Sequence, residues 1–120
     1  MRWGAALLCL IGGAAAAAPI EHLSWAQRPP ETCSLTVDFG SVCCGVDAAM
    51  HERITRAVIA DAGVKRAYSW PWGQEGESTL CLVTRSGADT RRLATQFKAW
   101  SAASRNPTLT QVWLGPKPHH

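Results

Sequence analysis

The pattern of hydrophobic and polar positions changes its period along this chain, and each change predicts a new element. Residues 35 to 39 alternate apolar and polar side chains and are followed by Gly40, as in a half-buried strand. Asp47 can then cap a helix that runs to about Ala62, because apolar residues recur at helical spacing and Gly63 supplies the stop. The first half of the chain therefore predicts a strand followed by a helix.

The second half predicts a hairpin, a second helix and a last strand. Residues 64 to 70 have an extended pattern, residues 71 to 76 are rich in turn formers, and residues 78 to 84 read as an apolar strand. Ser86, with an aspartate three residues later, resembles a capping box that opens the second helix. Residues 109 to 114 then predict the last strand.

The six elements follow the order strand, helix, strand, strand, helix, strand. With right-handed crossovers, this order predicts an α+β domain over residues 33 to 114: a ferredoxin-like βαββαβ sandwich with one four-stranded antiparallel sheet and both helices on one face. That topology places the loop with Cys43 and Cys44 at the same end of the sheet as Trp70 and Trp72. The helix residues expected to face the core are Met50, Ile54 and Val58, and Leu93, Phe97 and Trp100.

The two ends of the chain carry different signals. Residues 1 to 17 have the order of a cleavable signal peptide, with one arginine, a short apolar run and a stretch of alanines. The apolar run is too short to span a membrane, so no stable span is expected after its removal. Residues 18 to 32 contain Pro29-Pro30 and no period, which predicts an extended lead-in, and residues 115 to 120 form a polar tail. We expect a secreted or periplasmic protein, and the abundance of alanine and arginine indicates a bacterial one.

Charge and composition narrow the classes of function. The chain has 12 Lys and Arg against 9 Asp and Glu, and loss of Arg2 with the leader would leave a net charge of about +2, which does not call for a nucleic-acid partner. A chain of this size forms one domain with a modest core, so cross-links would stabilise it. Because no catalytic or nucleotide-binding motif stands out, a non-enzymatic protein is expected, and an enzyme with a concave site is the further alternative.

Four cysteines follow the leader, and an even number in a small exported domain favours disulfides over free thiols. Cys33 opens the first strand and Cys81 lies in the third, which are neighbours in the expected sheet, so we expect these two to pair. Cys43 and Cys44 then remain together in the loop. A disulfide between the two is the less favoured outcome because it is strained, and the alternative is that one or both pair with Cys33 or Cys81.

Cys43 and Cys44 are also candidates for chemistry, because they precede a helix N-terminus, where the helix dipole stabilises a thiolate. Residues 35 to 37, the cysteine loop, the first helix and residues 63 to 67 resemble the front half of a heavy-metal-associated domain, over about a third of the chain. That family spaces its loop cysteines as Cys-x-x-Cys, whereas the two are adjacent here. The resemblance implies the ferredoxin-like fold and binding of copper or another soft metal ion, with His51 as a further candidate ligand.

Tryptophan is abundant, with six in the chain and five of them after the leader. Trp70 and Trp72 flank Pro71 at the hairpin and are candidates for a surface that binds a partner protein, a peptide or a glycan. The alternative is that their indoles pack over the end of the sheet. The leading hypothesis is therefore an exported, non-enzymatic binding module stabilised by disulfides. The alternative is a periplasmic soft-metal-binding or thiol-redox protein that uses Cys43 and Cys44.

Overall fold

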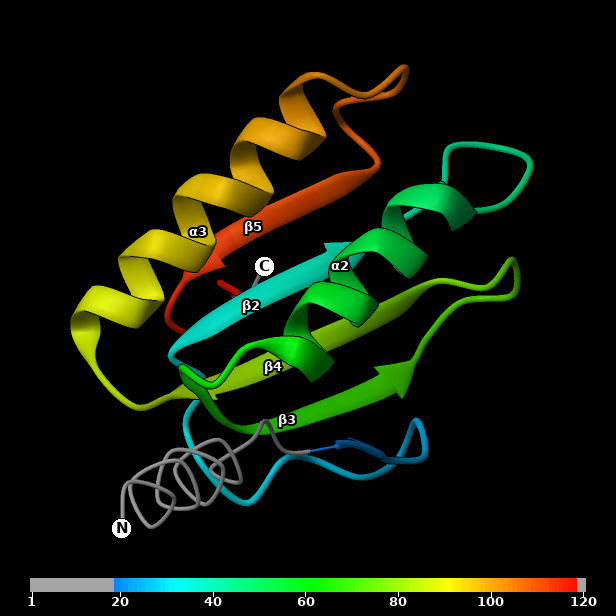
Figure 1. Ribbon diagram of the computed structural model, residues 1–120. Helices are drawn as coiled ribbons and strands as arrows, with labels where there is room; N and C mark the ends of the chain where they lie inside the picture. The colour runs from blue at the N-terminus through cyan, green and yellow to red at the C-terminus, as the bar shows by residue number, and fades with distance from the viewer. Residues whose placement is uncertain (1–18, 119–120) are drawn as a thin grey trace, which may run out of the picture.

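The computed structural model describes residues 19 to 118 and places two helices on one face of a five-stranded sheet (Figure 1). The strands are β1 (Ile20–His22), β2 (Leu35–Phe39), β3 (Val64–Pro71), β4 (Ser78–Thr84) and β5 (Thr110–Leu114), and the helices are α2 (Ala48–Ala60) and α3 (Gly87–Ala102). The expected signal peptide, residues 1 to 17, lies outside the described residues. Within residues 19 to 118, no helix has both the length and the apolar character needed to cross a membrane.

The sheet differs from the one that the sequence predicted. Its order is β1-β3-β4-β2-β5, with β1 parallel to β3 and the other neighbours antiparallel. The expected four-stranded antiparallel ferredoxin-like sandwich is therefore wrong, because the sheet is five-stranded and mixed. The predicted sheet left β3 as an edge strand, with backbone groups that lack partners on one side. In the structure these groups pair with residues 20 to 22, which add the fifth strand. Ile20 lies opposite Ala67 and packs against the main core.

Strand β2 follows the alternation seen in the sequence but is buried along its whole length. Leu35, Val37 and Phe39 belong to the main core, under the two helices. Thr36 and Asp38 alternate with them and therefore face the opposite side of the sheet. Asp38 is only 7% exposed, although it is an acidic residue on the face that no helix covers. Something other than a helix must therefore cover this part of the sheet.

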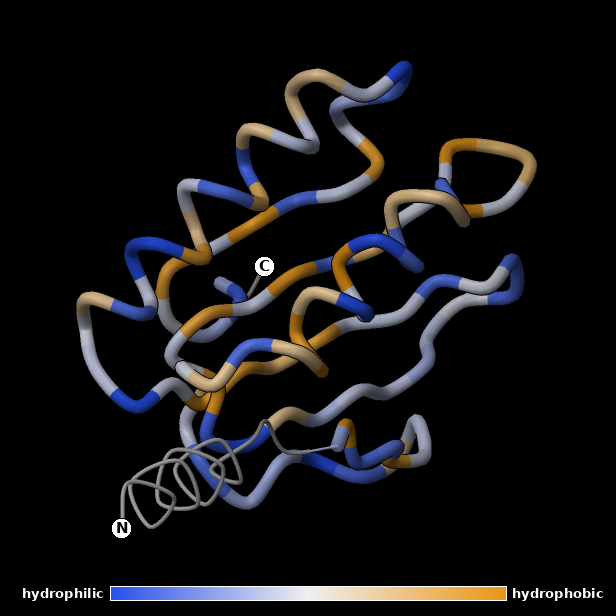
Figure 2. The backbone as a smooth tube through the Cα atoms, in the orientation of Figure 1, coloured by the Kyte–Doolittle hydropathy of each residue, from blue (hydrophilic) through white to orange (hydrophobic). Residues whose placement is uncertain are grey.

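Both helices begin where the sequence places their caps. The side chain of Asp47 accepts a hydrogen bond from the backbone N–H of Met50 at 3.0 Å, and that of Ser86 accepts one from the N–H of Asp89 at 3.1 Å. Each helix turns an apolar stripe towards the sheet, and Figure 2 shows hydrophobic residues along the strands and on these inner sides. The buried helix residues are Met50, Ile54 and Val58 in α2 and Leu93, Ala94, Phe97 and Ser101 in α3.

Candidate functional site

The helix-free face of the sheet carries two rows of side chains, because opposed residues on neighbouring strands lie side by side. One row runs Trp70, Thr79, Asp38 and Gln111, and the next runs Tyr68, Cys81, Thr36 and Trp113. The rows combine aromatic rings, a disulfide sulfur and one buried carboxylate. This mixture is unusual for a face that is only exposed to solvent, and it makes the helix-free side the candidate location of a functional site.

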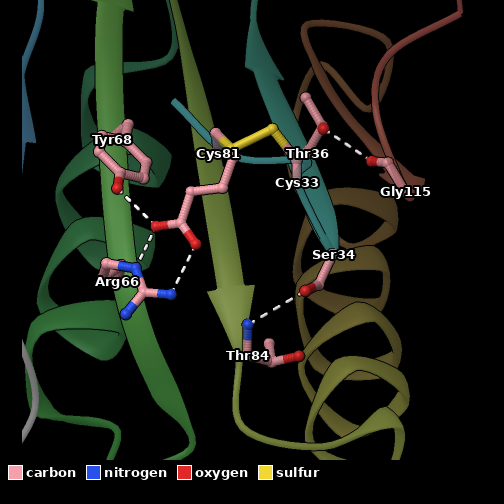
Figure 3. Close-up of a disulfide and its surroundings, with 9 residues drawn as sticks. Cys33, Ser34, Thr36, Arg66, Tyr68, Cys81, Thr84 and Gly115 are labelled. Atoms are coloured by element: carbon pink, nitrogen blue, oxygen red, sulfur yellow. Dashed lines mark hydrogen bonds and ion pairs between the residues drawn. A yellow bond between two sulfur atoms is a disulfide. The ribbon is translucent and has the colours of Figure 1, made fainter. Parts of the chain in front are cut away.

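The lead-in segment crosses this face between β1 and β2. The backbone N–H of Leu23 donates to the carbonyl of Ser69 on β3 at 2.7 Å, which continues the pairing of β1. Further along, a disulfide joins Cys33 to Cys81 of β4, the pair that the sequence favoured, with Cα atoms 5.3 Å apart (Figure 3). Leu23, Cys33, Tyr68 and Cys81 form a second buried cluster beneath the segment. The disulfide therefore fastens the lead-in across the sheet.

A carboxylate of the lead-in adds a polar tie beside this disulfide. Glu31 accepts hydrogen bonds from the guanidinium of Arg66 and, at 2.6 Å, from the hydroxyl of Tyr68, and both partners lie on β3 beside Cys81 (Figure 3). These hydrogen bonds, first from Arg66 and then from Tyr68, lower the pKa of Glu31 from 4.5 to about 2. The ionised form of Glu31 is thus the one that holds the segment in place.

This pairing predicts a specific response to acid. A depressed folded-state pKa stabilises the fold above the unfolded pKa, and this stabilisation disappears as the pH falls through the folded value. We expect the urea midpoint of the wild type to fall between about pH 4.5 and about pH 2 more steeply than that of Glu31→Gln. Glu52→Gln removes an exposed carboxylate of α2 and serves as the control. Parallel curves for the wild type and Glu31→Gln would contradict this assignment.

A groove with a cavity volume of about 1020 Å³ lies between the lead-in, the hairpin and the C-terminal tail. It is lined by Trp25 of the lead-in and by Trp70 and Trp72 of the hairpin, and we call it the tryptophan groove. Trp25 is 79% exposed, and Trp72 is 36% exposed. The structure thus brings together the two tryptophans that the sequence singled out. It adds Trp25, which sequence reasoning missed because the lead-in has no periodic pattern.

The buried Asp38 lies next to the groove, in a network with Thr79 and Trp72, which line it. Asp38 Oδ1 accepts a hydrogen bond from the hydroxyl of Thr79 at 2.6 Å, and the indole Nε1–H of Trp72 donates to that same hydroxyl oxygen at 3.0 Å. The other oxygen, Oδ2, accepts a hydrogen bond from the ammonium of Lys117 at 2.9 Å. The C-terminal tail, expected only as a polar end, therefore covers this acidic position.

The Cys43–Cys44 loop lies on another part of the surface. It packs against the hairpin turn, as the hydroxyl of Ser41 donates to Glu77 at 2.8 Å and the N–H of Gly45 donates to Glu75 at 3.1 Å. Figure 2 shows the loop before α2 as a hydrophobic stretch at one end of the molecule. The two cysteines line a second cavity of about 690 Å³, between the start of α2 and residues 104 to 109, which shares no lining residue with the tryptophan groove.

Cys43 and Cys44 are joined to each other by a disulfide, the outcome that the sequence analysis favoured less. The pairing follows from the other disulfide, because Cys33 and Cys81 are consumed in the second buried cluster and cannot reach the loop. Both loop cysteines are exposed, close to the N-terminus of α2. An accessible disulfide of this kind is open to attack by an external thiolate, which is the requirement for thiol–disulfide exchange.

His51, the third candidate ligand, lies on α2 and packs its ring against Phe39, with the ring centroids 4.6 Å apart. Burial lowers its pKa, and the neighbouring His22 lowers it further. Among the described residues no group of three or more His, Cys, Asp or Glu side chains is placed to hold a metal ion. The structure therefore does not gather Cys43, Cys44 and His51 into a three-ligand site.

No family model, curated protein or solved structure matches this chain significantly. The chemistry of the surface is therefore what indicates its function. The tryptophan groove offers exposed indole rings and, next to its lining residue Thr79, the buried carboxylate of Asp38, while the cysteine loop offers an accessible disulfide. Of these two, the groove can provide the larger contact area, and it is built from segments that the fold holds in place.

Proposed function

We propose that the protein is a small exported binding module that takes an extended peptide segment of a partner protein in the tryptophan groove. The observation that carries this proposal is Trp25, which is 79% exposed at the rim of a groove that Trp70 and Trp72 also line. An indole ring buries a large apolar area at a small cost in side-chain entropy, so exposed tryptophans gathered at one groove favour recognition of a partner.

The composition of the groove favours an extended peptide over a glycan or a flat protein surface. Four prolines line it together with the three tryptophans, and aromatic grooves of this kind bind extended segments that already have restricted backbones. The four are Pro29, Pro71, Pro116 and Pro118. The chain's own tail already runs along the groove, which supports the view that the shape accepts an extended backbone.

Export is the second part of the proposal. It is supported by the signal-peptide order of residues 1 to 17 and by the two disulfides, since disulfides form and persist in oxidising compartments. The lead-in that carries Trp25 is fixed to the sheet by one of these disulfides. The groove would thus keep its shape in the compartment where the partner is expected.

The test is a selection of random peptides displayed on phage, carried out against the oxidised full-length protein, followed by titration of the selected peptides by calorimetry. We expect Trp25→Ala to weaken the binding of these peptides by at least about tenfold, the size expected for loss of a central aromatic contact. Ile59→Ala removes an exposed apolar side chain from α2, on the opposite side of the sheet, and should leave the binding unchanged.

Two outcomes would contradict the proposal. The first is that the selected peptides bind Trp25→Ala and the wild type equally. The second is that no peptide is selected while an array of glycans gives specific binding that Trp25→Ala abolishes. In that case the groove recognises sugar rings rather than peptides. Folding of each variant is checked by its far-UV circular dichroism and by the absence of free thiols.

A further inference from the structure

We propose that Asp38, Trp72 and Trp113 form a subsite for a lysine ammonium group of the bound segment, and that the chain's own Lys117 fills this subsite until the partner displaces it. This inference rests on the proposed peptide-binding function of the groove and names the chemistry of its ligand. The ligand is an extended segment of a partner protein in which a lysine lies between prolines. Lys117, between Pro116 and Pro118, belongs to the tail that forms one wall of the groove, and its ammonium group is the internal competitor at the subsite.

The geometry around the Lys117 ammonium is that of a built cation site. Its Nζ lies 2.9 Å from Asp38 Oδ2, 5.2 Å from the ring centroid of Trp72 and 5.7 Å from that of Trp113. An ammonium group within about 6 Å of the face of an indole ring is attracted by the negative charge density of that face. The site therefore joins one formal charge with two aromatic rings that come from the hairpin and from β5.

Asp38 is held in place by contacts other than its ion pair with Lys117. It is 7% exposed, and the hydroxyl of Thr79, itself held by the Trp72 indole, already satisfies Oδ1. The other oxygen, Oδ2, accepts the hydrogen bond from Lys117, a residue that lines the groove. Within residues 19 to 118, Lys117 is the single basic residue that forms an ion pair with Asp38. Loss of the partner of a buried carboxylate strongly destabilises the fold, so the binding of another cation at Asp38 is favourable whenever Lys117 leaves.

The tail is held in a way that allows exchange. Both backbone polar groups of Gly115 are hydrogen-bonded. Its N–H donates to the carbonyl of Ser34 at 2.8 Å, and its carbonyl accepts a hydrogen bond from the hydroxyl of Thr36 at 2.7 Å. Beyond Gly115, the ion pair of Lys117 is the one polar contact recorded for residues 116 to 118. The flanking prolines keep this stretch extended. A partner segment of the same kind can therefore replace these residues while β5 stays in the sheet.

The experiment uses the full-length oxidised protein and a synthetic peptide with the sequence of residues 114 to 118, blocked at both ends. We expect Lys117→Ala to bind this peptide at least about tenfold more tightly than the wild type, since the internal competitor keeps most wild-type molecules closed. Lys98→Ala removes an exposed lysine of α3 and should behave as the wild type. A second peptide, with norleucine in place of lysine, should bind Lys117→Ala at least about tenfold more weakly than the first.

Two further variants are made in the Lys117→Ala background. Asp38→Asn should remove the preference for the lysine peptide, and Trp113→Leu, which leaves the carboxylate in place, should reduce that preference if Asp38→Asn fails to fold. Equal binding of the two peptides by Lys117→Ala, or binding of neither, would overturn the ammonium subsite. Phage-selected peptides that depend on Trp25 but need no basic residue would overturn this inference alone. Loss of the Trp25 dependence would overturn the proposed function instead.

Discussion

Replacement of Phe97 by alanine is expected to lower the free energy of unfolding by about 3 to 5 kcal/mol, the cost of removing an aromatic ring from a packed core. Phe97 is fully buried in α3 and faces the sheet among the apolar side chains of β2 and β4. Its ring also contacts that of Trp100, at a centroid distance of 5.6 Å. A domain of this size has a total stability of only about 5 to 15 kcal/mol, so this single change would bring it close to unfolding.

Urea unfolding followed by far-UV circular dichroism measures this loss without relying on tryptophan emission, which the change beside Trp100 would alter directly. Lys98→Ala is the matched control, because this residue is the next one along the helix and points to solvent. The control should change the stability by less than about 0.5 kcal/mol. A loss below about 1 kcal/mol for Phe97→Ala would mean that α3 does not press this face against the sheet.

The main core could be predicted from the sequence because its signals are local. The alternation at residues 35 to 39 and the capping signals at Asp47 and Ser86 lie within a few residues of the elements they define. Thr36 and Asp38 are buried although the alternation predicted a half-buried strand. At the two helix caps and at Phe97, which is buried as its place in the helical stripe predicts, tertiary packing agrees with the local preferences. Local pattern and fold therefore support each other in this half of the structure.

Strand β1, which the expected four-stranded sheet lacked, could not be predicted in this way. Residues 20 to 22 are too few to show a period, and their pairing depends on the free edge of β3, which exists only in the folded sheet. The lead-in that contains this strand also carries Trp25, so the absence of a period concealed both the strand and one wall of the tryptophan groove. The error in fold class and the missing site residue thus have one physical cause.

The contact between Asp38 and Lys117 was hidden for a related reason. The two residues are 79 positions apart, and each has an ordinary local explanation, Asp38 as the polar position of an alternating strand and Lys117 as part of a polar tail. A single sequence contains no signal that joins them. What the sequence did contain was Trp72, whose indole holds the network together through Thr79, but its role depends on a register that only the folded sheet defines.

The second large effect is expected from the disulfide between Cys33 and Cys81. Replacing both cysteines by alanine should lower the stability by about 2 to 4 kcal/mol, because the bond closes a long loop in the unfolded chain. The two residues are 48 positions apart in sequence, and both are buried with Leu23 and Tyr68. The loss would also free the lead-in from the sheet, so the tryptophan groove should lose one of its walls along with the stability.

The matched control is the variant in which both Cys43 and Cys44 are replaced by serine. This disulfide joins neighbouring residues and barely restricts the unfolded chain, so we expect the control to change the stability by less than about 0.5 kcal/mol. Mild reduction followed by alkylation should label the exposed Cys43 and Cys44 before the buried pair. Equal losses in the two double variants, or a peptide map that joins Cys81 to a cysteine of the loop, would show that the lead-in is fastened to the sheet by some other means.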